Sequence, residues 1–184
     1  MEPTHKGWHS RGYLPHFDST ETIQFVTFRL ADSLPASVAE SLAETDHRLD
    51  AGLGACWLKD PAVAAFAQDA LLHFDGTRYR LLAWCIMPNH VHAVMEVAHG
   101  YQLGAIVRSL KSFSASQANR IIGRTGRFWH RDYFDRFIRD DGHLHRTIDY
   151  VENNPVKAGL ASAPAVWPWS SAHERAGGSR SRRL

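Results

Sequence analysis

The chain has 184 residues, 44% of them hydrophobic and 22% charged, a composition that fits a globular protein and excludes a disordered or fibrous one. Its two cysteines, Cys56 and Cys85, form no CxxC pair, so we expect a reducing cytoplasmic setting and neither a disulfide scaffold nor a cysteine-ligated zinc module. No apolar run approaches the ~20 residues of a membrane span and the first residues hold no apolar signal segment, so neither a membrane protein nor a secreted one is expected.

Hydrophobic periodicity and turn residues divide the chain into strands and helices. In chain order we expect a polar arm over residues 1–19, a strand over 22–30, helices over 36–49 and 62–74, strands over 79–87 and 91–97, a helix over 102–122, a strand over 128–138 and a helix over 143–153. Pro88-Asn89 joins two of the strands as a hairpin. Asn154-Pro155 is expected to close the last helix, because a residue before proline disfavours the α conformation.

The order of these elements predicts the fold class. Without the additional helix near the start, the first six are β-α-β-β-α-β, the order of the ferredoxin-like, split β-α-β arrangement. We therefore expect an α+β fold with an antiparallel sheet, helices on one face and a C-terminal helix carrying Tyr150. The expected divisions are an arm over 1–19, one domain over 20–160 and an extension with a basic tail over 161–184.

The helix over 102–122 has two chemically distinct sides. An apolar stripe is formed by Leu103, Ile106, Val107, Leu110 and Phe113. The net charge of the whole chain is only +2, yet between residues 101 and 131 there are six basic side chains and no acidic one, and the last ten residues add four arginines. This pattern is typical of a protein that meets a polyanion such as nucleic acid, although a solvated helix face and an inert tail produce it too.

His90 and His92 flank Val91 at the start of a predicted strand. Side chains at positions i and i+2 of a strand project to the same face, so both imidazoles point one way, a spacing that suits two ligands of one divalent metal. The alternative is a polar pair on a solvent-facing side of the strand. No further histidine or cysteine lies at zinc spacing, which argues against a closed structural zinc site.

Tyr150 and Asn154 lie four residues apart near the end of the last predicted helix and so face the same direction. A phenol becomes a useful nucleophile when a metal polarises the electrophile and holds it in line, and an amide oxygen can complete the metal shell without adding charge. A core or surface tyrosine is the alternative.

Several stretches in order resemble the single-tyrosine HUH transposases, and most closely their REP-associated tyrosine transposase branch. The stretches are residues 87–92 (MPNHVH), 128–136 (FWHRDYFDR) and 150–160 (YVENNPVKAGL), with 11–17 (RGYLPHF) at the start and 167–171 (WPWSS) at the end. The resemblance thus covers nearly the whole chain.

This resemblance implies a metal-dependent single-stranded DNA nickase and strand transferase that acts at REP-type hairpins through a 5′-phosphotyrosine. It implies that His90, His92 and Asn154 bind Mg²⁺ or Mn²⁺ and that Tyr150 is the nucleophile. Asn154 departs from the glutamine of the wider family but matches the branch. A monomer or a homodimer, cytoplasmic and associated with the nucleoid through DNA, is expected.

Other parts of the chain could contact the DNA. The basic residues expected to do so are Arg11, Arg108, Lys111, Arg124, Arg127, Arg131 and Lys157. Phe128, Trp129 and Tyr133 could stack on unpaired bases or could be core residues. Two other functions stay open: a domesticated hairpin-binding protein without catalysis, and a metal phosphodiesterase that uses water and leaves Tyr150 without a role.

Overall fold

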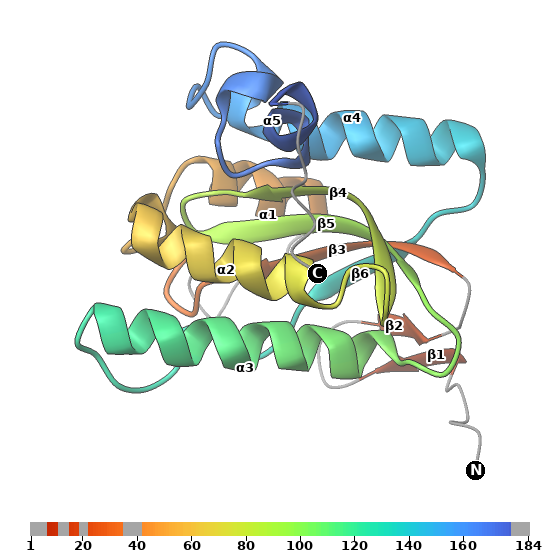
Figure 1. Ribbon diagram of the computed structural model, residues 1–184, viewed down its shortest axis with the longest axis horizontal. Coiled ribbons are helices and arrows are strands. Elements are labelled where there is room, and N and C mark those ends of the chain that lie inside the picture. Colours follow the sequence, from red (N-terminus) through yellow and green to blue (C-terminus); the bar gives the residue numbers. More distant parts are fainter. Residues whose placement is uncertain (1–6, 11–14, 19–21, 35–41, 178–184) are drawn as a thin grey trace.

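One four-stranded antiparallel sheet organises the protein (Figure 1). The computed structural model describes residues 7–10, 15–18, 22–34 and 42–177. The strands are β3 (Ile23–Arg29), β4 (Tyr79–Ile86), β5 (His90–Val97) and β6 (Phe134–Phe137), and they lie in the order β4-β5-β3-β6. The first and third strands of the β-α-β-β-α-β unit are therefore central neighbours, which confirms the predicted ferredoxin-like fold class.

Helices cover both faces of this sheet (Figure 1). The helices are α1 (Leu42–Asp50), α2 (Pro61–His73), α3 (Leu103–Ile121), α4 (Asp141–Lys157) and α5 (Ser171–Ala176), with short 3-10 turns η1 (Trp57–Lys59) and η2 (Pro164–Val166). Helices α2 and α3 pack on one face, and α4 packs on the other. No helix among the described residues is both long and apolar enough to cross a membrane.

The predicted N-terminal arm contains a short β-hairpin. Strands β1 (Gly7–Ser10) and β2 (Pro15–Asp18) pair antiparallel in a separate two-stranded sheet. Arg11, expected to contact DNA, lies outside the described residues, as do residues 178–184 of the basic tail and the first part of the helix predicted over 36–49.

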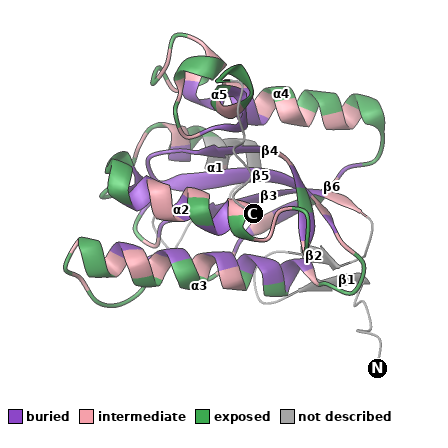
Figure 2. Cartoon of the chain, in the orientation of Figure 1, coloured by how far each residue is buried: buried purple, intermediate pink, exposed green. Residues whose placement is uncertain are grey.

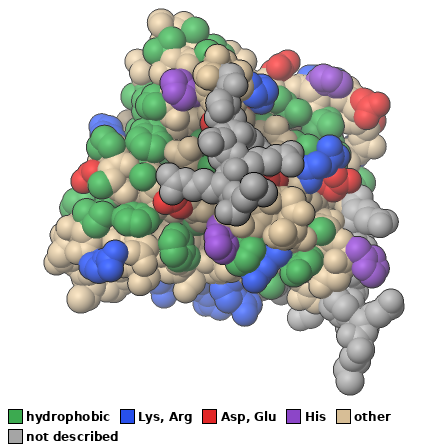
Figure 3. Space-filling view, viewed as in Figure 1, with side chains coloured by type: hydrophobic (Ala, Val, Ile, Leu, Met, Phe, Trp, Pro, Cys, Tyr) green, Lys and Arg blue, Asp and Glu red, His purple; other side chains and the backbone are tan. Residues whose placement is uncertain are grey.

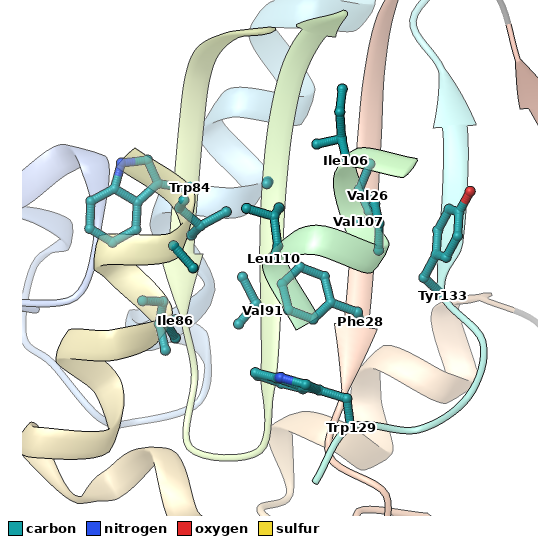
Figure 4. Close-up of a cluster of buried hydrophobic side chains, with 14 of the residues drawn as sticks. Val26, Phe28, Trp84, Ile86, Val91, Ile106, Val107, Leu110, Trp129 and Tyr133 are labelled. Atoms are coloured by element: carbon teal, nitrogen blue, oxygen red, sulfur yellow. The ribbon is translucent and has the colours of Figure 1, made fainter. Parts of the chain in front are cut away.

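The larger core lies between the sheet and the α2–α3 layer. Val26 and Phe28 of β3 meet Ile106, Val107 and Leu110 of α3 in this cluster (Figure 4). The central strands are buried along nearly their whole length (Figure 2), because helices cover both sheet faces. A second cluster, which includes Phe25 and Val94, fills the space under α4.

Two details of α3 and its neighbourhood differ from the sequence prediction. Phe113 is 46% exposed, and the buried face continues through Ser114, whose hydroxyl accepts a hydrogen bond from Nε1 of Trp129 at 2.9 Å. The strand predicted over 128–138 is shorter, since β6 covers only Phe134–Phe137, although Trp129 still pairs with Leu30 in an isolated bridge. The rings of Phe128, Trp129 and Tyr133 belong to the core cluster that includes α3. With exposed fractions of 2%, 4% and 7%, these three rings are core residues and do not present a surface for base stacking.

Helix α4 does not end where the sequence predicts. It begins at the cap Asp140, whose carboxylate accepts from the backbone N–H of His143 at 2.7 Å, and it runs through Pro155 to Lys157. Pro155 has no backbone N–H, so the helix loses one backbone hydrogen bond there. The hydrogen bonding continues beyond it, because the backbone N–H of Ala158 donates to the carbonyl of Asn154 at 3.0 Å. Burial of Val151, Asn154 and Pro155 against the sheet outweighs the local preference of the residue before proline.

The chain beyond α4 returns to cover the edge strand β4. The backbone N–H of Ile86 donates to the carbonyl of Trp169 at 2.8 Å, and Nε1 of Trp167 donates to the carbonyl of Ile86 at 2.9 Å. Ser171 then accepts from the N–H of Trp84 at 3.0 Å and donates to Glu152 of α4 at 2.5 Å. These contacts satisfy an otherwise open sheet edge and link α4 to its own sheet.

Candidate active site

His90 and His92 lie at the start of β5, on the sheet face that α4 covers. Both imidazoles are fully buried, and their Nε2 atoms lie 3.0 Å apart. The alternative of a polar pair facing solvent is therefore wrong. Two ring nitrogens that converge in this way can be ligands of one cation.

The outer nitrogen of each imidazole is held by a neighbouring side chain. Nδ1 of His90 donates to Oδ1 of Asn89 at 2.8 Å, and Asn89 in turn donates its Nδ2 to the carbonyl of Leu53 at 2.9 Å. Since an amide oxygen only accepts, His90 carries its proton on Nδ1 and keeps a lone pair on Nε2. The Thr27 hydroxyl, directly across from His92 in the β3–β5 register, hydrogen-bonds Nδ1 of His92 at 2.7 Å.

Burial also fixes the charge of the two imidazoles. It lowers the pKa of His92 to about 3. It lowers the pKa of His90 well below its usual value, and the neighbouring His92 adds to this shift. Both rings are therefore neutral near pH 7, the state in which an imidazole binds a metal.

Tyr150 comes to this pair from α4. Its ring lies edge-on to His92 with 5.6 Å between the ring centroids and edge-on to Phe25 at 6.0 Å. Lys157, the last residue of α4, places its Nζ 4.8 Å from the centroid of the Tyr150 ring. The fold thus brings the predicted nucleophile and the predicted ligands together within one chain.

Asn154 follows Tyr150 by one helical turn and is fully buried. Neither its Oδ1 nor its Nδ2 makes a hydrogen bond with any described residue. An unpaired polar group in a dry interior costs about 1–3 kcal/mol, so this amide fits a function that needs a free donor or acceptor. A bound cation would pair the amide oxygen.

The three predicted ligands are chemically suited to a divalent cation. Two imidazole nitrogens and an amide oxygen are neutral donors that Mg²⁺ and Mn²⁺ accept, and ligands at about 2.1 Å in octahedral geometry stand roughly 3.0 Å apart, the spacing of the two Nε2 atoms. In the described part of the chain no three His, Cys, Asp or Glu side chains form a metal-binding group. The candidate for a third direct ligand is therefore the amide oxygen of Asn154.

The predicted DNA-contacting residues fall in different places. Arg108 is exposed on α3, in the helix layer on the opposite side of the sheet from Tyr150, and basic side chains gather along the edge of the molecule near α3 (Figure 3). Lys111 donates to the carbonyls of Arg131 and Asp132 at 3.1 and 3.3 Å. These carbonyl contacts give Lys111 a role within the fold.

The remaining basic residues lie on the loop after α3 and at the end of α4. Arg127 and Arg131 are exposed, and Arg124 lies 5.8 Å from the ring centroid of Trp57. Lys157 is exposed beside Tyr150. Of these basic residues, among those the structure describes, Lys157 is the one with a contact to Tyr150.

Sequence reasoning missed Thr27, whose hydroxyl hydrogen-bonds Nδ1 of His92. A threonine in a β-branched strand carries no functional signal, because it is interpreted as a strand former. Its role follows from its pairing with His92 across β3 and β5, and that pairing is not visible in one sequence.

Comparisons with known proteins show which proteins the chain is similar to. The family model described as transposase, IS200 like, matches residues 72–154, which run from α2 through both histidines to Asn154. A Haemophilus influenzae protein named as a candidate REP-associated tyrosine transposase is 32% identical over 105 residues, which make up 52% of this chain and 60% of that protein. The REP-associated tyrosine transposase of Escherichia coli is 25% identical over 96 residues, 52% of this chain and 55% of that one.

The matched region spans less than two thirds of either relative. Among solved structures, a REP-associated tyrosine transposase bound to a REP hairpin has the same fold, with a TM-score of 0.54 at 19% identity over 92% of this chain and 85% of that chain. The resemblance stated from the sequence motifs is confirmed.

Proposed function

We propose that this chain, a relative of the REP-associated tyrosine transposases with the IS200-like segment at residues 72–154, nicks and transfers single-stranded DNA. One observation carries the proposal above all others. The Tyr150 ring packs against His92, whose Nε2 converges with that of His90, so a nucleophile and two ligands share one site.

The ligands proposed for Mg²⁺ or Mn²⁺ are His90, His92 and Asn154. When bound, the ion supplies a Lewis acid that polarises the phosphate. Thr27 and Asn89 hold the two imidazoles so that their Nε2 atoms converge. The free amide of Asn154 supplies the third donor.

Tyr150 performs the covalent step in this proposal. Its phenol oxygen attacks the phosphorus of a DNA phosphodiester, the new bond from oxygen to phosphorus replaces the bond to the 3′ oxygen, and that oxygen leaves as a 3′-hydroxyl. The phenol loses its proton to solvent as the bond forms and the departing 3′ oxygen takes up one proton from solvent, so the step is balanced; the 5′ end stays on the protein as a phosphotyrosine. Attack by a 3′-hydroxyl reverses the step, so strands are joined without ATP.

The proposed partner is a DNA hairpin of the REP type. A REP-associated tyrosine transposase with the same fold has been solved bound to a REP hairpin, and the exposed basic residues on α3 and its following loop suit a phosphate backbone. Arg108, Arg127 and Arg131 are the exposed candidates for these contacts.

The test is covalent capture. The protein is incubated with single-stranded hairpins from its own genome in Mg²⁺ or Mn²⁺ and run on a denaturing gel. We expect a protein–DNA band with the wild type and with Tyr101→Phe, an exposed tyrosine before α3 that serves as control, and none with Tyr150→Phe, whose hairpin affinity stays within about threefold.

Each other outcome separates the alternatives. A band that persists in Tyr150→Phe rejects Tyr150 as the nucleophile. Cleavage by the wild type without any band identifies a phosphodiesterase that uses water. Tight hairpin binding without cleavage in either metal identifies a binding protein.

A further inference from the structure

A carboxylate from a distant part of the chain faces the histidine pair. Asp50, the last residue of α1, places its Oδ1 3.8 Å from Nε2 of His90, and its side chain is 22% exposed. The Nδ1 atoms of both histidines already have side-chain partners. Asp50 therefore lies on the ligand side of the pair, where a cation and its water would be.

The turn after α1 is built around this position. Gly54 has φ +86°, and a Cβ there would lie 2.7 Å from the backbone oxygen of Asp32, so the close approach requires glycine. Oδ2 of Asp32 accepts from the N–H of Ala55 at 3.1 Å. The turn is thus anchored to the loop after β3.

The same turn is tied to the histidines. The carbonyl of Leu53 accepts from Nδ2 of Asn89, whose Oδ1 accepts from Nδ1 of His90. One amide therefore orients the imidazole and holds the segment that carries Asp50. The two side-chain hydrogen bonds of Asn89 thus connect the turn after α1 to the start of β5.

A carboxylate at this position would supply negative charge that the other three ligands lack. Two imidazoles and an amide offer a divalent cation no negative charge, whereas Mg²⁺ is usually held through one or two carboxylates and keeps several of its waters. We propose that Asp50 is a further side chain of the metal site, whose carboxylate stabilises the cation through charge and through a water of its shell. This inference rests on the proposed metal-dependent function.

The experiment measures metal binding without DNA. Mn²⁺ is titrated by calorimetry into the full chain as wild type, Asp50→Asn, Asp50→Glu and His90→Ala, with Asp69→Asn on the exposed face of α2 as the matched control. We expect Asp50→Asn to bind Mn²⁺ about 10- to 100-fold more weakly, as removal of an outer-shell partner does, and Asp69→Asn to bind as the wild type does. Asp50→Glu keeps the charge and is expected to retain most of the affinity.

The outcomes are distinguishable. Loss of binding in His90→Ala with equal affinities of wild type and Asp50→Asn overturns the role of Asp50 and leaves the metal site standing. A wild type that binds no Mn²⁺ overturns the metal site itself, and with it the metal-dependent part of the proposed function. Should Asp50→Asn fail to fold by circular dichroism, Asp50→Ser takes its place, and wild-type affinity in that variant counts against the proposal.

Discussion

Tyr150 lies edge-on to His92, with 5.6 Å between their ring centroids, although one residue comes from the closing helix and the other from a central strand. The contact exists because α4 packs on the face of β4 and β5 that bears the histidines. The end of α4 is also linked to α5 and to the edge of β4 through Glu152 and Ser171. The position of the Tyr150 phenol therefore depends on the packing of α4 against the sheet and on its hydrogen bonds to α5.

We predict that Thr27→Val weakens divalent metal binding. The valine keeps the shape of the side chain but leaves Nδ1 of His92 without its partner at 2.7 Å, and loss of such a partner typically lowers metal affinity about 10- to 100-fold. Thr27→Ser keeps the hydroxyl and should bind the metal with wild-type affinity. Calorimetric titration with Mn²⁺ checks the change, and equal affinities of the valine and serine variants would show that the hydroxyl has no role.

We predict that Lys157→Gln slows formation of the covalent DNA adduct. The ammonium lies 4.8 Å from the Tyr150 ring centroid, and such a cation favours the phenolate character that develops as the phenol attacks. We expect a decrease of about two- to fivefold in rate, in line with the modest energies of exposed cation–aromatic pairs. Single-turnover assays on a hairpin measure it. Arg146→Gln, on the exposed side of the same helix, is the control, and an equal loss there would point to a general effect of charge.

We predict that Glu152→Ala destabilises the fold. Glu152 is buried, accepts from Ser171 at 2.5 Å and pairs with Arg175, so its loss leaves two groups of α5 without their α4 partner. We expect the free energy of unfolding to fall by about 1–3 kcal/mol in urea denaturation. Asp149→Ala, exposed on the same helix, should change it by less than about 0.5 kcal/mol. Matching values for the two variants would mean that the link between α4 and α5 contributes nothing.

We predict a pH-dependent contribution of Lys111 to stability. Burial, more than its neighbours, lowers the pKa of its ammonium from 10.5 to about 8 in the folded chain. The unfolded chain therefore binds more protons between about pH 8 and 10.5, and stability rises with pH across that window. The free energy of unfolding of the wild type, minus that of Lys111→Met, should increase from pH 8 to pH 10.5. A difference that is flat over this range would show that the amine is not desolvated.

The sequence alone predicts the positions of some site and core residues correctly and those of others incorrectly. The strand alternation that placed His90 and His92 on one face agrees with the structure, and so does the helical spacing that placed Tyr150 and Asn154 together. The apolar stripe of α3 was predicted to run from Leu103 through Phe113; it is buried as far as Leu110, whereas Phe113 is exposed. At that point Ser114 is buried because Trp129, from another segment, needs a hydrogen-bond acceptor, and periodicity has no access to such a partner.

The amino-acid sequence by itself determined the element order, the shared face of the histidines and the family likeness. These features depend on backbone geometry between near neighbours, which repeats along any strand or helix. Only the tertiary structure decided that Asp50 and Thr27 meet the histidines, that the aromatic residues before β6 are core, and that α4 runs past its proline. Those outcomes depend on which distant segments exclude water together, and that free energy belongs to the packed chain as a whole.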